Sequence, residues 1–549
     1  MDKQTQRIVP DPIKAGLASG WRVTDASTLT DKLALDADVA IIGTGAGGGV
    51  TAEILALAGL RVLLIEEGPL KSSSDFKMRE AQAYPALYQE SAARKTRDKA
   101  INILQGRSVG GSTTVNWTSS FRTPRTTLAY WQQHYGLKEL DADAMAPWFT
   151  MMEQRLNIGV WLTPPNENND LLRRGAAKLG IPAAAILRNV KGCWNLGYCG
   201  MGCPTNAKQS MLVTTIPSAL SHGAQLLTRA RADRFTFKGD QAESLQCLAM
   251  DASGLATTGQ TITVRAKHFV VAGGAINSPA LLMRSKAPDP HNLLGKRTFL
   301  HPTVVSSGVF DQKVEGYAGA PQTIYSDHFL ETQAIDGPIG YKLEAPPLHP
   351  LLFSSTMNGF GAQHAAMMRE FPHAHALLAL LRDGFHDQSQ GGTVQLRDDG
   401  YPVLDYPLTD FIWDGARRAL LSMAEIQFAA GAKRVYPVHE MAEGYGSWPA
   451  ARAAIEALPY KPLLTRVVSA HVMGGCAMSD DEKLGVVSST GRYHGLRNVS
   501  VHDGSLFPTS IGANPQLSIY GLTARLASGL STSLTGKPAP SLSGSAATA

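Results

Sequence analysis

The residues with the most evident chemical capacity are a histidine, a group of cysteines and an asparagine in glycine-rich surroundings. The histidine, His471, opens the stretch HVMGGCAM at 471–478. Imidazole has a pKa close to neutral, so it can accept or donate a proton at physiological pH. A lone histidine in an apolar stretch is more often a buried, hydrogen-bonded residue than a catalytic base. The role of His471 therefore depends on whether an electron-accepting group lies beside it.

Three cysteines follow the spacing C-x5-C-x3-C in a glycine-rich stretch, at Cys193, Cys199 and Cys203. A zinc site is disfavoured because the stretch lacks a close C-x2-C pair and a fourth ligand. Three thiolates are enough for a three-iron cluster, so an iron–sulfur site stays open as an alternative. We favour ordinary buried thiols in a tight loop.

A phosphate-binding pattern lies near the start of the chain. The β-branched run at 39–42 predicts a buried parallel strand, 48–57 predicts a helix, and 61–65 predicts a second strand. The turn after the first strand has the order G-x-G-x-x-G, at Gly43, Gly45 and Gly48. The succession of strand, turn, helix and strand is far more specific than the glycines alone.

Each part of this pattern serves the binding of a dinucleotide. The glycines let the backbone approach a pyrophosphate, and the helix N-terminus attracts its negative charge. An acidic residue about 20 positions further on accepts a hydrogen bond from a ribose hydroxyl. Glu66 stands where that acceptor belongs, and Glu67 is the neighbouring alternative. The pattern predicts a Rossmann-like domain and does not separate NAD from FAD.

Three further stretches have the composition of ligand-binding turns. Residues 106–124 form a loop of glycines and small hydroxyl residues that can lie flat against a planar ligand. Residues 269–285 predict a strand, a glycine turn and a helix capped by Ser278 with Pro279 at its first position. Residues 499–527 predict a strand, a loop and a helix, with Asn514 capping and Pro515 at the first helical position.

Together these stretches resemble the glucose–methanol–choline (GMC) family of FAD oxidoreductases, nearest its long-chain alcohol oxidase or cytochrome-linked sugar or alcohol dehydrogenase branches. The resemblance runs in order from about residue 37 to residue 528. Besides the dinucleotide pattern it rests on four motifs: G-R-x-x-G-G-S-x-x-x-N at 106–116, G-A-x-x-S-P-x-L-L at 274–282, H-x-x-G-x-x-x-M at 471–478 and D-G-S…N-P-Q-L at 503–517. Five motifs in the family's order make a chance similarity very improbable.

The resemblance implies an α/β fold with a Rossmann-like FAD-binding domain and a substrate domain built on an antiparallel sheet with helices. On this basis we expect the FAD domain to comprise residues 36–152, 210–303 and 466–534. The substrate domain is expected to comprise 153–209, with the cysteine loop, and 304–465.

The resemblance also assigns roles to single residues. It implies that His471 takes the hydroxyl proton of an alcohol while hydride passes to the flavin, and that Asn514 donates to the developing oxyanion. His301 and His502 are expected to be structural. Residues expected to contact FAD are Gly43, Gly45, Ala46, Gly48, Glu66, Glu67, Arg107, Gly110, Gly111, Thr113, Asn116, Ala272, Asp503, Gly504 and Pro515. No histidine stands in 106–116, so we expect non-covalent FAD.

Within the expected substrate domain, residues 373–382 predict an apolar helix that covers the core, lines a pocket or rests on a membrane surface. Residues 391–408 predict a hairpin around an Asp-Gly turn, as part of the sheet that walls the site. No cluster of carboxylates or arginines marks a charged substrate. We therefore expect a neutral, bulky or long-chain alcohol, with a sugar as the alternative.

The electron acceptor stays open between oxygen, a quinone and a cytochrome. For the reaction itself there are three hypotheses, of which the FAD-dependent oxidation of an alcohol is the first. An iron–sulfur-linked sugar or alcohol dehydrogenase that delivers electrons to a cytochrome partner is the second hypothesis. A flavin-dependent lyase without net oxidation is the third, and it belongs to another class of reaction.

Composition sets the outer limits. The chain has 549 residues, of which 44% are hydrophobic and 18% charged, and a net charge of +5 without a run of basic residues. A nucleic-acid partner is therefore not expected. No secretory leader or membrane span is evident, and five cysteines without a leader argue against a disulfide framework. We expect a cytoplasmic protein with a flexible tail at 535–549.

Overall fold

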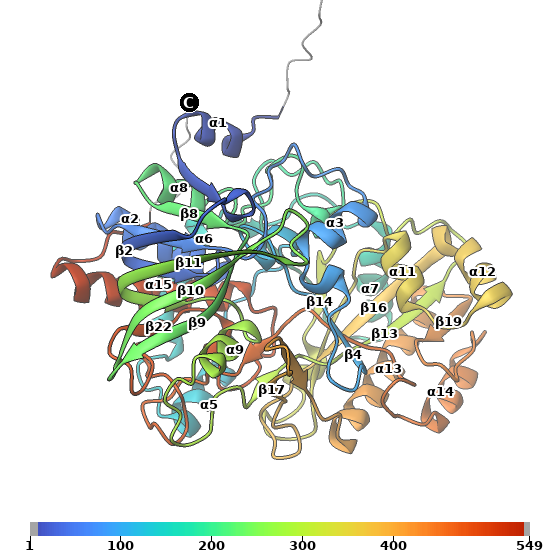
Figure 1. Cartoon of the computed structure of the whole chain (residues 1–549). Helices are drawn as coiled ribbons and strands as arrows, with labels where there is room; N and C mark the ends of the chain where they lie inside the picture. The colour runs from blue at the N-terminus through green and yellow to red at the C-terminus, as the bar shows by residue number, and fades with distance from the viewer. Residues whose placement is uncertain (1–8, 543–549) are drawn as a thin grey trace, which may run out of the picture.

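The computed structural model describes residues 9–542 and places two large sheets side by side (Figure 1). The first sheet has the strand order β1-β8-β3-β2-β11-β10-β9, with β22 also paired to β11. Its strands are β1 (Arg22–Asp25), β2 (Leu33–Ile42), β3 (Val62–Ile65), β8 (Gln225–Thr228), β9 (Ala230–Lys238), β10 (Gln241–Met250), β11 (Thr257–Val271) and β22 (Val499–Val501). The pairs from β1 to β11 are parallel, whereas β9, β10 and β11 are antiparallel neighbours.

The dinucleotide pattern folds as a β-α-β unit in the middle of this sheet. Helix α2 (Ala46–Leu57) connects β2 to β3, and the two strands pair in parallel from Val39↔Val62 to Ile42↔Ile65. The helix begins two residues earlier than its composition predicted because Ala46 and Gly47 are helical. Helices α15 (Gln516–Thr535) and α8 (Thr215–Ser221) pack on α2, which explains why an almost wholly apolar helix is stable there.

The second sheet is largely antiparallel, with the order β4-β20-β13-β16-β15-β14-β6 and β19 also paired to β13. Its strands are β4 (Ile101–Ile103), β6 (Ala184–Ala185), β13 (Thr303–Val309), β14 (Ile324–Ser326), β15 (Tyr341–Glu344), β16 (Ala374–Leu381), β19 (Arg434–Pro437) and β20 (Val467–Ser469). Strands β4 and β20 come from segments that the sequence assigned to the FAD domain, and they are the one parallel pair in this sheet.

Helices cover both faces of the second sheet, so its central strand is buried on both sides. Leu377, Ala379 and Leu381 pack toward the cluster that contains helix α13 (Asp410–Ala430). The alternate residues Leu378 and Leu380 share a second cluster with helix α11 (Pro350–Thr356). Helix α7 (Glu167–Lys178) also contacts α13, and α12 (Gly361–Arg369) follows α11.

The prediction of a helix at 373–382 was wrong, because these residues form strand β16. A strand buried on both faces has no alternation of polar and apolar residues, so it cannot be told from a buried helix by pattern. The hairpin formed as predicted, from β17 (Thr393–Leu396) and β18 (Pro402–Asp405). It is a separate two-stranded sheet and not part of the large antiparallel one.

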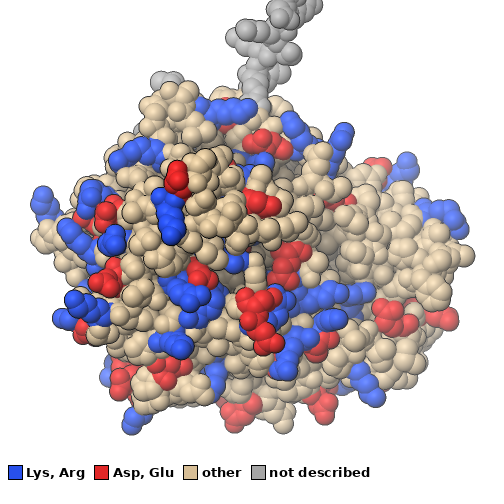
Figure 2. Space-filling view, in the orientation of Figure 1, with Lys and Arg blue, Asp and Glu red and all other residues tan. Residues whose placement is uncertain are grey.

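The remaining elements connect these layers at the surface and around the site. They are α1 (Pro12–Ala18), α3 (Glu80–Leu87), α4 (Ser112–Val115), α5 (Arg125–Tyr135), α6 (Ala142–Arg155), β5 (Ile158–Val160), β7 (Leu187–Asn189), α9 (Asn277–Arg284), β12 (Thr298–Phe299), α10 (His328–Glu331), α14 (Trp448–Ala457) and β21 (Met473–Gly474). Among the described residues, no helix combines the length and apolarity needed to cross a membrane. Figure 2 shows basic and acidic side chains interspersed over the face in view. Of the tail expected to be flexible, residues 543–549 lie outside the described part.

Candidate active site

A cavity of about 760 Å³ is lined by residues from both large sheets. At one end lie the ends of β2 and β3 and the turn before α2, including Gly43, Gly45 and Glu66. At the other end lie His471 and Asn514, together with residues of β13, β16 and β20. The cavity therefore joins the dinucleotide turn to the two residues that the sequence singled out for proton chemistry.

The glycines of the turn are required by close backbone contacts. Gly43 has φ +103, and a Cβ there would lie 2.2 Å from the carbonyl oxygen of Ala272. A Cβ on Gly48 would lie 2.0 Å from the carbonyl oxygen of Gly43. Gly45 differs, because the nearest atom to its Cβ would be 3.9 Å away, at Gly111. The surface of Gly45 is thus left open for a ligand that approaches the N-terminus of α2.

Glu66 stands at the end of β3, where the sequence placed a ribose acceptor. Its carboxylate already accepts from the Thr44 hydroxyl at 2.6 Å and from the Gly68 backbone N–H at 2.9 Å. Burial raises the pKa of Glu66, and these hydrogen bonds oppose the shift. Oε2 also accepts from the Thr44 backbone N–H at 3.2 Å, whereas Oε1 keeps a second lone pair, so Glu66 can hold the turn and still accept from a ligand through Oε1. Glu67 lines the same part of the cavity.

Most residues predicted to contact a cofactor do line the cavity. They are Gly43, Gly45, Ala46, Glu66, Glu67, Gly111, Thr113, Asn116, Ala272, Asp503, Gly504 and Pro515. Gly48, Arg107 and Gly110 are not in its lining. The Arg107 guanidinium instead donates to the carbonyl oxygen of Gly254 at 2.6 Å, in the turn between β10 and β11. Gly110 donates its backbone N–H to the Thr44 hydroxyl, so it supports the turn from behind.

Asp503 connects two chain segments at the cavity wall. Its carboxylate accepts from the Gly274 backbone N–H at 2.8 Å and from the Ser278 hydroxyl. Ser278 also accepts from the Gly273 backbone N–H at 2.9 Å. The predicted role of Ser278 as a helix cap was wrong, because α9 begins at Asn277 and Ser278 lies inside the helix. The Asp503 contacts hold the glycine turn after β11 against the end of β22.

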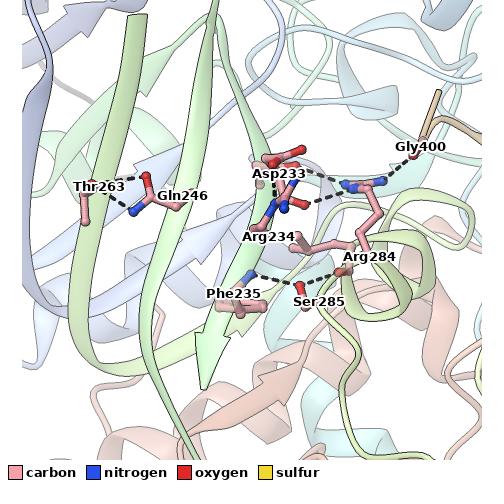
Figure 3. A network of polar contacts seen from close by, with 10 residues as sticks. Asp233, Arg234, Phe235, Gln246, Thr263, Arg284, Ser285 and Gly400 are labelled. Atoms are coloured by element: carbon pink, nitrogen blue, oxygen red, sulfur yellow. Dashed lines mark hydrogen bonds and ion pairs between the residues drawn. The ribbon is translucent and has the colours of Figure 1, made fainter. Parts of the chain in front are cut away.

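A network of hydrogen bonds around helix α9 forms part of the cavity wall (Figure 3). Arg284 donates to the carbonyl oxygens of Asp233 at 2.9 Å and Gly400 at 3.3 Å. Ser285 accepts from the backbone N–H of Phe235 at 2.9 Å. These contacts tie β9 and the tip of the β17–β18 hairpin to α9, so the separate hairpin forms part of the cavity wall.

His471 presents an imidazole to the other end of the cavity. Its Nδ1 lies 3.3 Å from Nδ1 of His301, and among the described residues nothing hydrogen-bonds to its Nε2. Burial, with a smaller contribution from Lys342, lowers the pKa of His471 to about 4. The ring is therefore neutral at pH 7, as a base must be, but it is a weaker base than an ordinary imidazole.

Asn514 belongs to a buried polar group that the sequence did not reveal. Its Nδ2 donates to Glu344 at 3.2 Å, and Gln322 donates to the same carboxyl oxygen. Burial raises the pKa of Glu344 to about 7, although Lys342 lowers it. The predicted capping role of Asn514 was wrong, since the residue that caps α15 is Pro515 and the helix begins at Gln516.

Asn116 also hydrogen-bonds within the protein at the cavity wall. It donates to the side-chain oxygen of Gln516 at 2.6 Å, and Gln516 donates in turn to the Ser119 carbonyl at 2.7 Å. Gln516 lines the cavity and was missed, although it stands in the same Asn-Pro-Gln motif as Asn514. Glu344 and Gln322 had no such local signal, because only the tertiary fold brings them to Asn514.

The wall that the antiparallel sheet contributes is uncharged. The strands contribute Thr303, Leu378, Leu380, Val468 and Ser469, and Trp117, Ser119 and Gln322 come from loops beside them. Most charged residues of the lining, such as Glu66, Arg231 and Asp399, come from the first sheet, its loops and the hairpin, whereas Arg94 lies in the segment before β4. This division places an apolar surface beside His471 and ionic groups at the dinucleotide end.

The cysteine loop packs against the 106–117 loop. Lys208 is buried, and its amino group donates to the carbonyl oxygens of Thr114 at 2.8 Å, Asn116 at 2.7 Å and Cys199 at 2.7 Å. Burial lowers the pKa of Lys208 to about 8.

Nowhere in residues 9–542 do three His, Cys, Asp or Glu side chains come together as a metal could require, so this geometry does not support the iron–sulfur alternative.

Comparisons with known proteins agree with these observations. Two family models match, both described as GMC oxidoreductase, at residues 84–303 and 387–523. A GMC-type oxidoreductase of Mycobacterium tuberculosis is 31% identical, over 89% of this chain and 75% of the relative. A long-chain-alcohol oxidase of Arabidopsis thaliana is 29% identical, over 91% of this chain and 69% of the relative. Pyridoxine 4-oxidase has a similar fold, with a TM-score of 0.66, 18% identity and coverage of 89% and 98%.

Proposed function

This chain belongs to the GMC oxidoreductases, and from that premise we propose that it uses FAD to oxidise an alcohol to a carbonyl compound. The observation that carries the proposal is one continuous cavity. It includes a glycine turn suited to a pyrophosphate and a neutral imidazole, that of His471, whose Nε2 has no hydrogen-bond partner within residues 9–542.

The residues at the first end fit FAD. The open surface of Gly45 and the N-terminus of α2 suit the pyrophosphate, and Glu66 with Glu67 suits a ribose. Asp503, Asn116 and Thr113 lie along the wall between the two ends. When bound, FAD supplies an acceptor for the hydride that leaves the carbinol carbon.

His471 and Asn514 handle the hydroxyl group in this proposal. Nε2 of His471 hydrogen-bonds to the hydroxyl oxygen and takes its proton as the carbinol carbon is oxidised. Carbon releases hydride far more readily from an alkoxide-like oxygen, so this proton transfer is worth about 10²–10⁴ in rate. Asn514, held by Glu344, supplies an amide N–H to the negative charge on the oxygen.

The substrate class follows from the uncharged wall. Leu378, Leu380, Val468 and Trp117 offer apolar surface in the same cavity as His471, and among the described residues no Lys, Arg, Asp or Glu of the antiparallel strands lines it. A neutral alcohol with a long or bulky apolar chain fits this surface better than a sugar, which needs many polar partners. Long-chain-alcohol oxidases among the relatives support the same choice.

The test is an anaerobic screen of the purified protein. We expect a yellow protein whose flavin absorbance is lost on mixing with primary alcohols of increasing length. Methyl ethers of the same chains lack the hydroxyl and serve as matched controls that leave the spectrum unchanged. Retention of the oxidised spectrum with every alcohol would favour the lyase alternative, and a colourless protein that takes up no FAD would end the proposal.

The electron acceptor is settled by the second half of the reaction. We propose oxygen, because the long-chain relatives and the structural neighbours are named as oxidases. After bleaching with an alcohol, admission of oxygen should restore the yellow colour within the turnover time. If only a quinone or a cytochrome restores it, the protein is a dehydrogenase.

A further inference from the structure

The hydrogen bonds of His301 determine where its proton lies. The backbone N–H of Gly512 donates to Nε2 of His301 at 3.0 Å. A backbone N–H is only a donor, so this nitrogen must present its lone pair. Burial lowers the pKa of His301 well below the ordinary value, with further contributions from His471, Lys342 and Arg382, so the ring is neutral. The proton of His301 therefore resides on Nδ1.

The proton of His471 follows from that of its neighbour. Nδ1 of His301 lies 3.3 Å from Nδ1 of His471, with the two rings nearly perpendicular at 84°. At this distance the two nitrogens form a hydrogen bond through one proton, and Nδ1 of His301 is the donor. Nδ1 of His471 is then the acceptor, and a neutral His471 carries its own proton on Nε2, the nitrogen without a protein partner.

We infer that His301 is a positioning residue that holds His471 in the Nε2–H form, so that the resting site meets a hydroxyl oxygen with a hydrogen-bond donor. This inference rests on the proposed function, because it concerns the nitrogen of His471 that meets the alcohol in that proposal. Nε2 of His471 can accept the hydroxyl proton only after both rings exchange tautomers. In that exchange water takes the proton from Nε2 of His471, His301 passes its Nδ1 proton to Nδ1 of His471, and water returns a proton to Nε2 of His301. The returned proton would displace the N–H of Gly512 from that nitrogen.

The surroundings of His301 hold it firmly in this arrangement. Its backbone N–H and that of Leu300 donate to the two carboxylate oxygens of Asp383, each at 3.1 Å. Tyr406 donates its hydroxyl to the same carboxylate at 2.6 Å. His301 also has φ +45, a conformation that a non-glycine residue adopts only when its neighbours enforce it. The sequence predicted a structural role for His301, and the contact with His471 extends that role to the end of the cavity where His471 lies.

The experiment is ¹⁵N NMR of the FAD-loaded protein with labelled histidine, because the two ring nitrogens of a neutral imidazole have well-separated shifts. The His471 signals are assigned by their loss in His471→Asn. At pH 7 we expect a protonated Nε2 and an unprotonated Nδ1. A protonated Nδ1, or a doubly protonated ring, in the wild-type protein overturns the inference whatever any variant does.

Substitutions of His301 test whether this residue determines which ring nitrogen of His471 carries the proton. His301→Phe keeps a ring but removes the donor, and we expect the ratio of the two His471 forms to change by about tenfold or more, the equivalent of one hydrogen bond. His301→Gln can offer N–H to His471 and oxygen to Gly512, so it should restore the Nε2–H form. His375→Phe, at a buried histidine bonded to Gln427 outside the cavity lining, is the matched control.

The outcomes separate this inference from the proposed function. An unchanged ratio in His301→Phe would show that another group sets the form of His471. If the shifts agree but no alcohol reduces the flavin, the proposed reaction fails while the role of His301 stands.

Discussion

At the residue scale, the reacting end of the cavity combines a neutral imidazole with a buried carboxyl group that holds two amides. His471 faces the cavity, and Glu344 lies behind Asn514 and Gln322. Both titratable groups have pKa values moved by burial, downward for the imidazole and upward for the carboxyl. Both shifts favour the neutral forms, which suits a site for a neutral substrate.

Removal of the imidazole should slow the chemistry without loss of the cofactor. We expect His471→Ala to lower the rate constant of flavin reduction by at least ~10², because proton transfer from the hydroxyl loses its positioned partner. The measurement is single-turnover reduction under anaerobic conditions, with the ratio of flavin to protein absorbance as a check on FAD content. A variant that reduces at the wild-type rate would assign the base elsewhere.

Glu344 predicts a specific dependence of stability on pH. The folded state holds its proton more tightly than the unfolded state, because burial raises the pKa from 4.5 to about 7. Its contribution to stability is therefore full below pH 4.5 and falls as pH rises to about 7, by about 3 kcal/mol in all. Glu344→Gln cannot ionise, so the difference in unfolding free energy between variant and wild type should grow in favour of the variant over this range. Urea unfolding from pH 5 to pH 8 measures it, and a difference that is constant with pH would contradict the assignment.

Motif residues were visible in the sequence, but their partners were not. His471, Asn514 and twelve cofactor-side positions were placed at the cavity from five motifs. Glu344 stands on strand β15 in a stretch with no motif, and only pairing of distant strands buries it behind Asn514. The predicted capping roles of Ser278 and Asn514 were wrong because both side chains donate to distant carboxylates, those of Asp503 and Glu344, in place of capping the helix.

At the element scale, the β2–α2–β3 unit is the part that local sequence determines most strongly. Buried apolar strands, glycines at forced contacts and a helix in between all favour the same structure. Strand β16 shows the opposite case, since AHALLALL is compatible with helix or strand until neighbouring strands pair with it. The tertiary environment of a two-sided core then decides in favour of the strand.

The glycine turn allows folding and cofactor binding to be separated. A Cβ on Gly48 would lie 2.0 Å from a backbone oxygen, so Gly48→Ala should destabilise the fold by about 1–3 kcal/mol. A Cβ on Gly45 meets no protein atom closer than 3.9 Å, so Gly45→Ala should fold normally but bind FAD less tightly. Thermal unfolding of the flavin-free proteins and FAD titration measure the two effects. Equal losses of stability in both variants would refute the distinction.

At the scale of the whole molecule, the two sheets contribute different parts of the cavity lining. The first sheet and the hairpin supply the charged, glycine-rich end, and the antiparallel sheet supplies the apolar wall. The cavity between them is formed from segments that are hundreds of residues apart in sequence. The two-domain organisation could be predicted because a motif stands in each segment of the chain that belongs to the first domain. That β4 and β20 join the second sheet could not be predicted, because neither strand carries a motif.

The apolar wall predicts a dependence on chain length. Each added CH₂ that is buried contributes about 0.8 kcal/mol, so kcat/KM for primary alcohols should rise roughly fourfold per CH₂ until the wall is covered. Steady-state kinetics with a homologous series of straight-chain alcohols checks this. A flat series, or a preference for sugars over aliphatic alcohols, would show that the wall does not bind the chain.

The central claim is that an alcohol transfers hydride from its carbinol carbon within this cavity. Its most direct test is anaerobic single-turnover mixing of the yellow protein with a primary alcohol and with the same alcohol deuterated at the carbinol carbon. The account predicts loss of the oxidised flavin spectrum with both, several times more slowly with the deuterated alcohol. Persistence of the oxidised spectrum on a protein that carries FAD and accommodates the alcohol would contradict it.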